Sequence, residues 1–265
     1  MKTVSLLTDF GIQDGYAGIL KGVIWSIAPD AQIVDLTHEV SPQNIQEGAF
    51  VLRMAASYFP AGTVHIAVID PGVGTTRRAM AARIGGQFFI APDNGLLTLV
   101  ILHAERAGLD VEYYHLNQPG FWLPRVSNIF HGRDIFAPVG AYLANGIPLD
   151  KMGVRIYDPG RFQIPNPISI AGGLRGQILF IDHFGNILTN LPGKNLPRNF
   201  QQDEMVVKIR GTAINNIENL SCKLISGDLS TITGMPQEMW ITAENGKASE
   251  FLQTRVGDAV DILFA

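Results

Sequence analysis

The chain has 265 residues, 46% of them apolar and 17% charged, which excludes intrinsic disorder as a description of the whole chain. A formal net charge of −4, without any long run of Lys or Arg, argues against a protein that grips nucleic acid or anionic lipid. The single cysteine, Cys222, cannot form an internal disulfide and excludes multi-cysteine zinc and iron–sulfur sites within one chain.

The N-terminal segment does not have the pattern of a targeting signal. The apolar run before Thr8 is too short for the core of a signal peptide, and no cleavage site follows it. No stretch of bilayer-spanning length is free of charges and of Pro or Gly, so we expect no transmembrane helix. Together with the lone cysteine, these features predict a cytoplasmic protein.

The first part of the chain alternates strand-like and helix-like segments. Apolar runs predict strands over residues 4–8, 32–36 and 64–69, and a pair of strands over 79–84 and 87–90 around Gly85-Gly86. Apolar residues at helical spacing predict helices over 16–27, 44–58, 96–107 and 135–144. This alternation predicts an open, mostly parallel α/β sheet covered by helices.

The second part of the chain has a different character. Pro and Gly are dense between residues 157 and 173, which predicts a linker. After it, strands are predicted over 176–182, 204–210, 222–225, 239–243 and 259–264, with few helical patterns between them. We therefore predict an N-terminal α/β domain over 1–156, a linker over 157–173, and a smaller, antiparallel, β-barrel-like domain over 174–265.

Polar loops lie where an α/β sheet binds its ligands. In open α/β sheets, ligands bind outside the carboxyl ends of the strands. Polar segments follow three predicted strands, at residues 8–15, 70–78 and 91–95, and a fourth lies before the last predicted helix, at 130–134. The first three should gather at one edge of the sheet, so we expect a functional site there.

Each of these loops also has a purely structural explanation. Asp14, and less readily Asp9, would serve to cap the helix that begins at Tyr16. Asp70 precedes Pro and Gly, as in an ordinary turn, and Asn94-Gly95 is a turn signal on any account. An isolated histidine such as His131 is more often a surface or satisfied side chain than a catalyst.

Several chemistries lack their sequence signals. The glycines of Gly72-x-Gly74 lack the third glycine and the context of a dinucleotide fingerprint, and there is no Walker lysine pattern. No Gly-x-Ser-x-Gly nucleophile motif is present, and Cys222 has no polar partner nearby in sequence. The histidines have no metal-ligand spacing, so the pattern does not support a metal site.

One segment of the second domain, residues 181–190, carries recognition chemistry. Asp182 can hold an amine, the ring of Phe184 can stack on a base, and the amide of Asn186 can pair with the edge of an adenine. The alternative is a tight β-turn with Gly185 at its corner.

These segments, taken together and in chain order, resemble one family. The matching sequences lie between residues 8 and 190 and are TDFG with Asp14, IVDLTHEV, FPAGTVHIAVIDPGVG followed by the double Arg, FIAPDNGLL, FHGRDIFAP and IDHFGNILTN. They are similar to the S-adenosylmethionine hydroxide adenosyltransferases (SAM hydrolases), the hydrolytic relatives of the SAM-dependent fluorinase and chlorinase.

The resemblance implies an architecture and a reaction. It implies a homotrimer of two-domain subunits, in which the N-terminal domain of one subunit and the C-terminal domain of its neighbour form each site. It implies that water attacks C5′ of the ribose of S-adenosyl-L-methionine and releases adenosine and L-methionine. The substrate is then the only small molecule required, and no metal or other cofactor is expected.

The resemblance also assigns residues by their positions in the motifs. Its catalytic set is Asp70, Arg77 and His131, although Arg78 is adjacent to Arg77 and the choice between them stays open. Its substrate-binding residues are Asp9 for the ribose diol, Asp14 and Asp182 for the methionine ammonium, and Phe184 and Asn186 for the adenine.

Two sequence features bear on whether the chain uses water or halide and on whether it is catalytic at all. The halogenating relatives carry tyrosines at the positions of Asp70 and His131 and a serine at that of Gly132, so this chain is expected to use water. The segment 226–237 departs from the family pattern, with Gly234-Met235-Pro236-Gln237 where a serine segment is expected. This departure motivates one alternative, a non-catalytic sensor of S-adenosylmethionine or adenosine.

A second alternative is a metal-dependent hydrolase. Its ligands would be Asp9, Asp70, His131 and Asp134, which carry the oxygen and nitrogen donors that such a centre uses. Activity that survives a chelator would exclude it.

Overall fold

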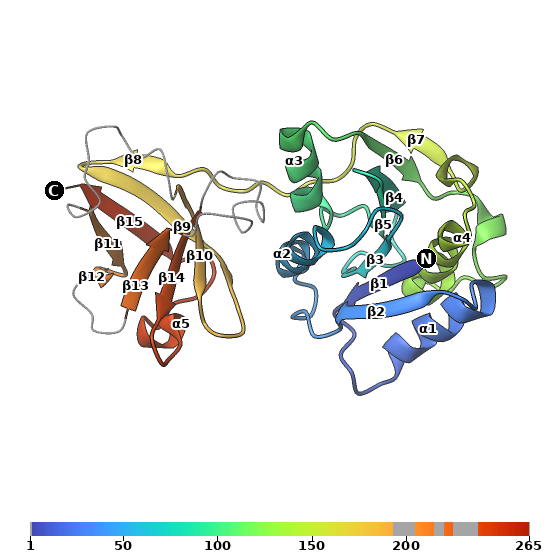
Figure 1. Cartoon of the computed structure of the whole chain (residues 1–265), viewed down its shortest axis with the longest axis horizontal. Helices are drawn as coiled ribbons and strands as arrows, with labels where there is room; N and C mark the ends of the chain where they lie inside the picture. Colours follow the sequence, from blue (N-terminus) through green and yellow to red (C-terminus); the bar gives the residue numbers. More distant parts are fainter. Residues whose placement is uncertain (1, 193–204, 215–219, 225–237, 265) are drawn as a thin grey trace. The chain divides into compact units, whose positions relative to one another are not determined.

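The computed structural model describes residues 2–192, 205–214, 220–224 and 238–264 (Figure 1). The chain divides into two compact units, Met1–Phe162 and Gln163–Ala265. The division falls within the segment 157–173, which is rich in Pro and Gly.

The first unit is built on a seven-stranded mixed sheet with the strand order β2-β1-β3-β5-β4-β6-β7. The neighbours β1/β2, β1/β3 and β3/β5 are parallel, whereas β4/β5, β4/β6 and β6/β7 are antiparallel. The strands are β1 (Thr3–Thr8), β2 (Gln32–Thr37), β3 (Val64–Val68), β4 (Ala79–Ile84), β5 (Gln87–Pro92), β6 (Val111–His115) and β7 (Val154–Ile156).

A hairpin explains why the prediction of a mostly parallel sheet is wrong for half of it. Gly85 and Gly86 have φ of 54° and 86°, values that glycine adopts without strain, and they join β4 to β5, the predicted pair of strands, which is antiparallel. The hairpin reverses the chain within the sheet. Because β6 then pairs with β4 on its outer side, the sheet continues antiparallel to β7.

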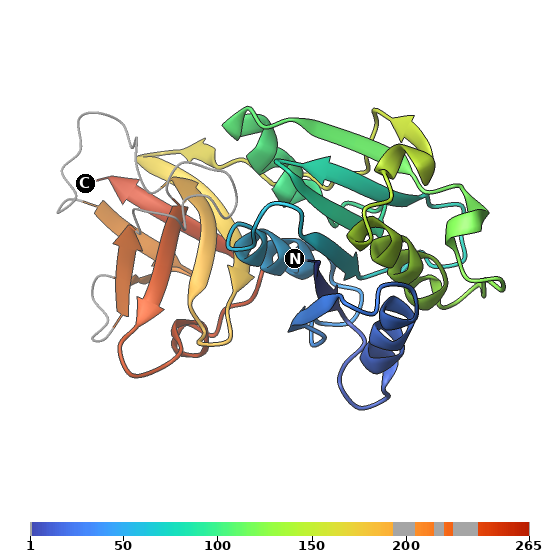
Figure 2. The ribbon, with the colours of Figure 1, turned by 45° about the vertical axis from the view of Figure 1, so that its right-hand side comes forward.

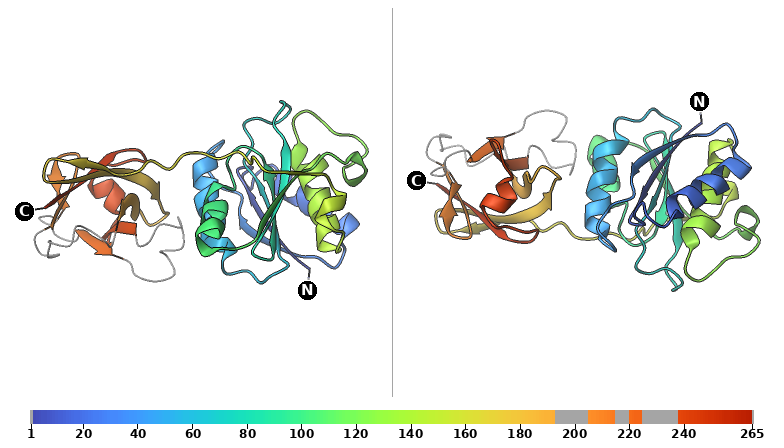
Figure 3. Two further views of the ribbon diagram at one scale, coloured as in Figure 1. Left: turned by 90° about the horizontal axis from the view of Figure 1, so that it is seen from above. Right: turned by 90° about the horizontal axis from the view of Figure 1, so that it is seen from below.

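Helices cover both faces of this sheet, with α2 and α3 on one side and α1 and α4 on the other (Figure 3). They are α1 (Tyr16–Ile27), α2 (Ile45–Ala56), α3 (Thr98–Ala107) and α4 (Ala137–Ala144). The side chain of Asn44 accepts a hydrogen bond from the main-chain N–H of Glu47 and so caps α2.

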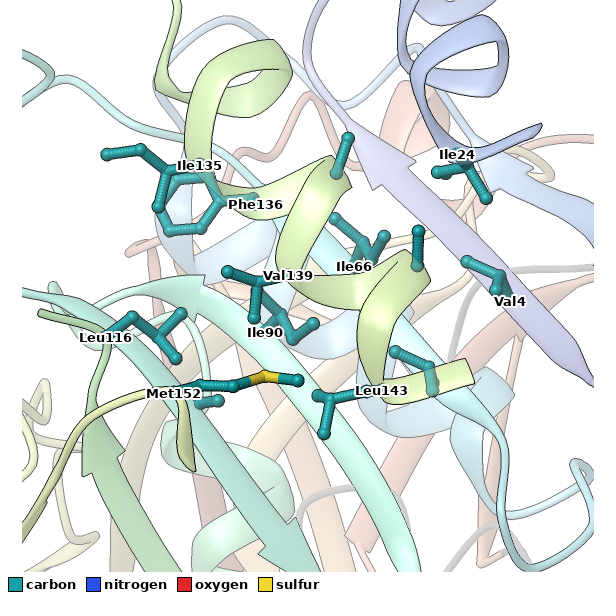
Figure 4. Close-up of a cluster of buried hydrophobic side chains, with 14 of the residues drawn as sticks. Val4, Ile24, Ile66, Ile90, Leu116, Ile135, Phe136, Val139, Leu143 and Met152 are labelled. Atoms are coloured by element: carbon teal, nitrogen blue, oxygen red, sulfur yellow. The ribbon is translucent and has the colours of Figure 1, made fainter. Parts of the chain in front are cut away.

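Helix α4 packs closely against the sheet because it is almost entirely small and apolar. Val139 lies beside Ile90 and Leu143 beside Met152 in the core (Figure 4). A Cβ atom at Gly140 would lie 2.4 Å from Cδ1 of Ile66, so only glycine permits this approach of helix and strand.

The second unit is a curled antiparallel sheet with the order β12-β11-β15-β9-β10-β14-β13, and β8 pairs with β9 (Figures 1 and 2). Its elements are β8 (Ile168–Ile170), β9 (Gly173–Ile181), β10 (Ile187–Pro192), β11 (Met205–Ile209), β12 (Thr212–Ala213), β13 (Leu220–Leu224), β14 (Glu238–Ala243), the short helix α5 (Ala248–Phe251) and β15 (Ala259–Phe264).

The long strand β9 makes the curl. It pairs with β15 over residues 173–177 and with β10 over 178–181, so it belongs to both halves of the sheet. A Cβ atom at Gly176 would lie 2.3 Å from Oδ1 of Asn190, so glycine lets the strands approach where the partner changes. The sheet encloses a core that includes Ile178, Ile187 and Ile262.

The predicted fold class is thus confirmed: an N-terminal α/β sheet unit and a smaller, half-barrel-like antiparallel unit. Among the residues described, none of the helices combines the length and the apolar character needed to cross a bilayer.

Candidate active site

The candidate site of the first unit lies at the carboxyl ends of the parallel strands. β1 ends at Thr8 and is followed by Asp9, while its parallel neighbour β3 ends at Val68 and is followed after one residue by Asp70. Parallel pairing places both strand ends at one edge of the sheet, as the sequence pattern predicts.

Asp70, Arg77 and His131 form one hydrogen-bonded group. Nε of Arg77 donates to Oδ1 of Asp70 at 2.9 Å, and its Nη2 donates to Oδ2 of Asp70 and to Nδ1 of His131, the latter at 2.8 Å. The carboxylate is 6% exposed and the guanidinium side chain 10% exposed. A two-pronged ion pair of this kind holds both side chains in a fixed orientation.

Two loops must lie close together to assemble this group. Gly74, in the loop of Asp70 and Arg77, has φ of 76°, and a Cβ atom there would lie 2.3 Å from the carbonyl oxygen of Asn128. The loop folds back through a hydrogen bond from Oγ1 of Thr75 to the carbonyl oxygen of Gly72, at 2.6 Å. Glycine at 74 therefore permits the contact between the loop 70–78 and the loop that leads to His131.

Asp134 anchors the loop that carries His131. It is fully buried, and its Oδ2 accepts from the main-chain N–H and the hydroxyl of Ser127, at 2.8 and 2.9 Å. Arg133 donates from Nε to the other oxygen at 2.6 Å. His131 stands directly before a π-helical turn, Gly132–Phe136, a distortion that is frequent at functional sites.

The bond from Arg77 fixes the proton position on His131. A guanidinium only donates hydrogen bonds, so Nδ1 of His131 accepts, and a neutral His131 carries its proton on Nε2. Burial, and then the positive charge of Arg77, lower the pKa of His131 below 6.5, against the opposing charges of Asp70 and Asp134. His131 is therefore neutral at pH 7.

Arg78 lies elsewhere. Its Nε donates to Asp93 at 2.7 Å, and its two terminal nitrogens donate to the carboxylate and the carbonyl oxygen of Asp158, at 2.8 and 2.7 Å. Asp93 also accepts from the main-chain N–H of Gly160. Arg78 thus holds residues 158–160 against the loop of Asp93 within the first unit, and Arg77 is the arginine that contacts Asp70 and His131.

Asp9 and Asp14 are placed differently. Oδ2 of Asp9 accepts from the main-chain N–H of Gln43 at 2.8 Å, which fixes the carboxylate beside the loop before α2. Asp14 is exposed. The capping alternative is wrong for both, because Gly15 is the N-terminal cap of α1 and no side chain bonds there.

An aromatic hollow of about 310 Å³ adjoins the segment that carries His131 and is lined by Phe10, Tyr16, Ile129 and Phe130. The rings of Phe10, Tyr16 and Phe130 meet edge to face, with centroids 5.3 to 6.2 Å apart. A Cβ atom at Gly132 would lie 3.2 Å from the ring of Phe10, so this glycine adjoins both the hollow and His131. Two of these rings lie within the motifs, Phe10 in TDFG and Phe130 in FHGRD, whereas Tyr16 lies outside them, and no sequence signal joins the three.

In the second unit, Asp182 and Asn186 close a turn on each other. Oδ1 and Oδ2 of Asp182 accept from the main-chain N–H and the amide of Asn186, both at 2.8 Å. Gly185, with φ of 77°, packs against Lys247, where a Cβ atom would lie 2.4 Å from the lysine Cβ. The turn is therefore rigid, and it exposes Phe184, whose side chain is 71% accessible.

The structure brings together some predicted residues and not others. Asp70, Arg77 and His131 form one group in the first unit, Asp9 lies at the same edge of the sheet, and Asp182 and Asn186 meet in the second unit. Asn94 bonds the carbonyl oxygen of Ile69 and is structural. The divergent segment 226–237 lies outside the described residues.

The described part of the chain holds no group of three or more His, Cys, Asp and Glu side chains arranged to bind a metal ion. Of the four ligands of the metal-dependent alternative, Asp134 already has both oxygens occupied by Ser127 and Arg133.

Comparisons with known proteins give consistent matches. Sequence models of the SAM hydroxide adenosyltransferase N-terminal and C-terminal domains match residues 4–153 and 176–261. The (R)-S-adenosyl-L-methionine hydrolase of Salinispora arenicola is 40% identical over 205 residues, 75% of this chain and 76% of that protein. The fluorinase of Nocardia brasiliensis is 33% identical over 222 residues, 74% of this chain and 73% of that protein. The crystal structure of an uncharacterized conserved protein from Thermotoga maritima aligns with a TM-score of 0.81 at 33% identity, covering 98% of this chain and 99% of that one.

Proposed function

Because this chain belongs to the SAM hydroxide adenosyltransferase family and is an enzyme, we propose that it hydrolyses S-adenosyl-L-methionine to adenosine and L-methionine. The observation that carries the proposal is the group formed by Asp70, Arg77 and His131 at the carboxyl edge of the sheet, with an aromatic hollow adjoining the segment that carries His131.

The reaction does not require a general acid. The leaving group departs from a sulfonium as a neutral thioether, so nothing has to protonate it. The difficulty lies in the nucleophile, because water is weak and must stand in line behind C5′. Fixed positioning is worth an effective molarity of about 10⁵–10⁸ M in favourable systems. Rigid polar groups around the water therefore supply most of the required effect.

The hydrogen bonds divide the roles within the group. His131 accepts from Arg77 through Nδ1, so it cannot take a proton there while that bond stands, and its Nε2 only donates. Asp70 keeps lone pairs on both oxygens beyond those that Arg77 uses. We assign Asp70 as acceptor of the water proton, and His131 and Arg77 as groups that orient the water and the carboxylate.

A weak base is sufficient at this position. As the C5′–O bond forms, the attacking water becomes a strongly acidic oxonium, so its proton passes to a carboxylate without a large barrier. The negative charge of Asp70 also lies near a cationic substrate, where it favours binding. The reaction then needs no metal ion.

The other residues that the family resemblance assigns would bind the substrate. Asp9 would accept hydrogen bonds from the ribose hydroxyls. Asp14 and Asp182 would accept hydrogen bonds from the methionine ammonium. Phe184 would stack on the adenine and Asn186 would pair with its edge. Exposure of Phe184 in the second unit supports a binding rather than a packing role.

We further propose a homotrimer in which the site is completed by a neighbouring subunit, in the cytoplasm. The family resemblance supports the assembly, and the distribution of candidate ligands over two units agrees with it. The lone Cys222 fits a reducing compartment.

Product analysis tests the proposal. The purified protein is incubated with S-adenosylmethionine and excess EDTA, and adenosine and methionine are quantified by mass spectrometry, with the Asp70→Asn variant as control. We expect equal amounts of both products, with and without EDTA, and a large loss in the variant. Saturable binding without products would instead establish the sensor alternative, and loss of activity in EDTA the metal-dependent one.

A further inference from the structure

A chain of polar side chains that the proposed mechanism does not use lies next to Asp9; it is buried at Thr8 and His38 and reaches the surface at Asp35. His38, in the loop after β2, is 5% exposed. Its Nδ1 lies 2.8 Å from Oγ1 of Thr8, which is fully buried, and its Nε2 lies 3.1 Å from Oδ1 of Asp35. Lys21 donates to the other oxygen of Asp35 at 2.5 Å.

The donors and acceptors of this chain have one consistent direction. The Asp35 carboxylate only accepts and lies 3.1 Å from Nε2 of His38, so it favours the tautomer with its proton on Nε2, in which Nδ1 accepts from the Thr8 hydroxyl. Oγ1 of Thr8 in turn accepts from the main-chain N–H of Phe10, at 3.2 Å. Burial raises the pKa of Asp35, but the bonds from Lys21 and His38 outweigh it and hold the pKa below 3.8, so the carboxylate stays charged.

His38 is connected to the main chain that follows Asp9 in two ways. Its side chain holds Phe10 through Thr8, and its own carbonyl oxygen accepts from the main-chain N–H of Gly11 at 2.7 Å. The two residues that follow Asp9 are therefore both tied to His38. These bonds fix the main chain on both sides of Asp9, and the main-chain N–H of Gln43, which donates to Oδ2 at 2.8 Å, then sets the direction of the carboxylate.

We propose that His38, acting through Thr8, is a positioning residue that holds the Asp9 carboxylate in place for the ribose diol of the substrate. The inference rests on the proposed function, in which Asp9 binds that diol. It predicts that breaking the Thr8–His38 bond weakens recognition of the ribose hydroxyls more than it weakens the fold.

The test compares two substrates. Thr8→Val keeps the shape of the side chain and removes the hydroxyl. The kcat/KM values are measured for S-adenosylmethionine and for its 2′-deoxy analogue. We expect kcat/KM for the full substrate to fall about tenfold, the size of one lost hydrogen bond, chiefly through KM. The value for the 2′-deoxy analogue should change far less.

A matched control exists on the same strand. Ser5 is also fully buried on β1, and its hydroxyl lies 2.6 Å from Nδ1 of another buried histidine, His65. Ser5→Ala removes an equivalent Ser/Thr–His bond away from Asp9. It should lower stability and leave the ratio of the two kcat/KM values unchanged.

Substitutions of His38 give an independent check. In His38→Asn the amide oxygen stands near the place of Nδ1 and can accept from Thr8, so this variant should retain most of the preference for the 2′-hydroxyl. His38→Leu has no acceptor and should lose it. An equal fall of kcat/KM for both substrates in Thr8→Val, or the same ratio in His38→Asn and His38→Leu, would overturn the inference.

Failure of the proposed function is recognised separately. If the wild type does not turn over S-adenosylmethionine, the same variants are titrated calorimetrically with adenosine and 2′-deoxyadenosine. Loss of the preference for adenosine in Thr8→Val, but not in Ser5→Ala, still supports the role of His38. A wild type without that preference, or a Thr8→Val protein that keeps it, contradicts that role.

Discussion

At the scale of single residues, the account depends on which atom of the Asp70–Arg77–His131 group is free to act. A motif names the three residues but not their proton positions. The bond from Arg77 to Nδ1 makes His131 an orienting group and leaves Asp70 as the proton acceptor. This division of roles separates the effects of two conservative substitutions.

Asp70→Asn should lower kcat by about 10²-fold or more, because the amide cannot take the proton and loses the ion pair with Arg77. His131→Asn keeps an acceptor near Nδ1 for Arg77 and should lower kcat by only about tenfold. Steady-state kinetics with circular dichroism as a folding control measures both. A larger loss in His131→Asn would identify histidine as the base.

The pH profile follows from the lowered pKa of His131. Protonation places an N–H at Nδ1, facing the Arg77 guanidinium, and breaks the group. Because burial and then Arg77 lower this pKa, activity should be lost as pH falls through a value below 6.5. We would measure kcat/KM in wild type and in His131→Asn, where this acid limb should be absent. A wild-type limb centred above 6.5 would argue against the assignment.

At this scale the sequence predicts which residues form the site but not how each of them is oriented. The residues of the group follow from motifs, but Arg77 and Arg78 are indistinguishable in sequence. They separate only because consecutive residues of this segment point in different directions, one toward Asp70 and the other toward Asp93 and Asp158. The aromatic hollow does not follow from the sequence because its rings come from two segments distant in the chain, one with Phe10 and Tyr16 and one with Phe130.

At the scale of elements, the contact between the loop 70–78 and the loop before His131 is the critical one. Gly74→Ala adds the cost of a positive φ, about 1 kcal/mol, and a clash with Asn128. Gly146→Ala pays the same φ cost at 86° with nothing within 4 Å. We expect Gly146→Ala to lose stability only by the φ cost and Gly74→Ala to lose more because of the clash, with a fall in kcat of about tenfold or more only in Gly74→Ala.

Urea denaturation and steady-state kinetics of both variants check this expectation. Wild-type kcat in Gly74→Ala would show that the loops assemble the group without that close approach.

Strand β3 carries a group that governs acid stability. His65 is fully buried against Phe59 and Phe89, and burial lowers its pKa from 6.5 to about 4. The unfolded chain therefore binds the proton more tightly than the folded one below pH 6.5. This group's share of stability is complete above 6.5 and is lost as pH falls toward 4, about 2 kcal/mol between pH 7 and pH 5.

The His65→Asn variant should lose this part of the pH dependence, whereas His183→Asn, at an exposed position, should not. Urea unfolding at pH 7 and pH 5, followed by tryptophan fluorescence, gives the two slopes. An unchanged slope in His65→Asn would contradict the assignment of acid lability to β3.

The elements that the sequence predicts well are those with a strong period. The helix over 16–27 is observed as predicted, and the others differ by a few residues at their ends. β6 does not follow from the sequence because VEYYH mixes charged and aromatic residues, and β10 does not because ILTN resembles part of a turn motif. The helix predicted over 135–144 is observed as a π-helical turn, Gly132–Phe136, followed by the regular helix α4 from Ala137.

At the scale of the whole molecule, the proposed trimer makes a prediction that a self-contained site does not. Asp70→Asn disables the first unit, and the double variant Phe184→Ala/Asn186→Ala disables the adenine contacts of the second. Co-expressed chains of both kinds should recover about a quarter of wild-type activity, because random assembly pairs intact units in one site out of four. Activity equal to the average of the two parents would show that each chain supplies its own complete site.

The central claim is that water attacks C5′ of the ribose, and isotope labelling tests it most directly. The protein would be incubated with S-adenosylmethionine in ¹⁸O-water, and the products analysed by mass spectrometry. The account predicts adenosine with one ¹⁸O at its 5′ oxygen, and unlabelled L-methionine. Unlabelled adenosine, or cleavage to methylthioadenosine, would contradict it.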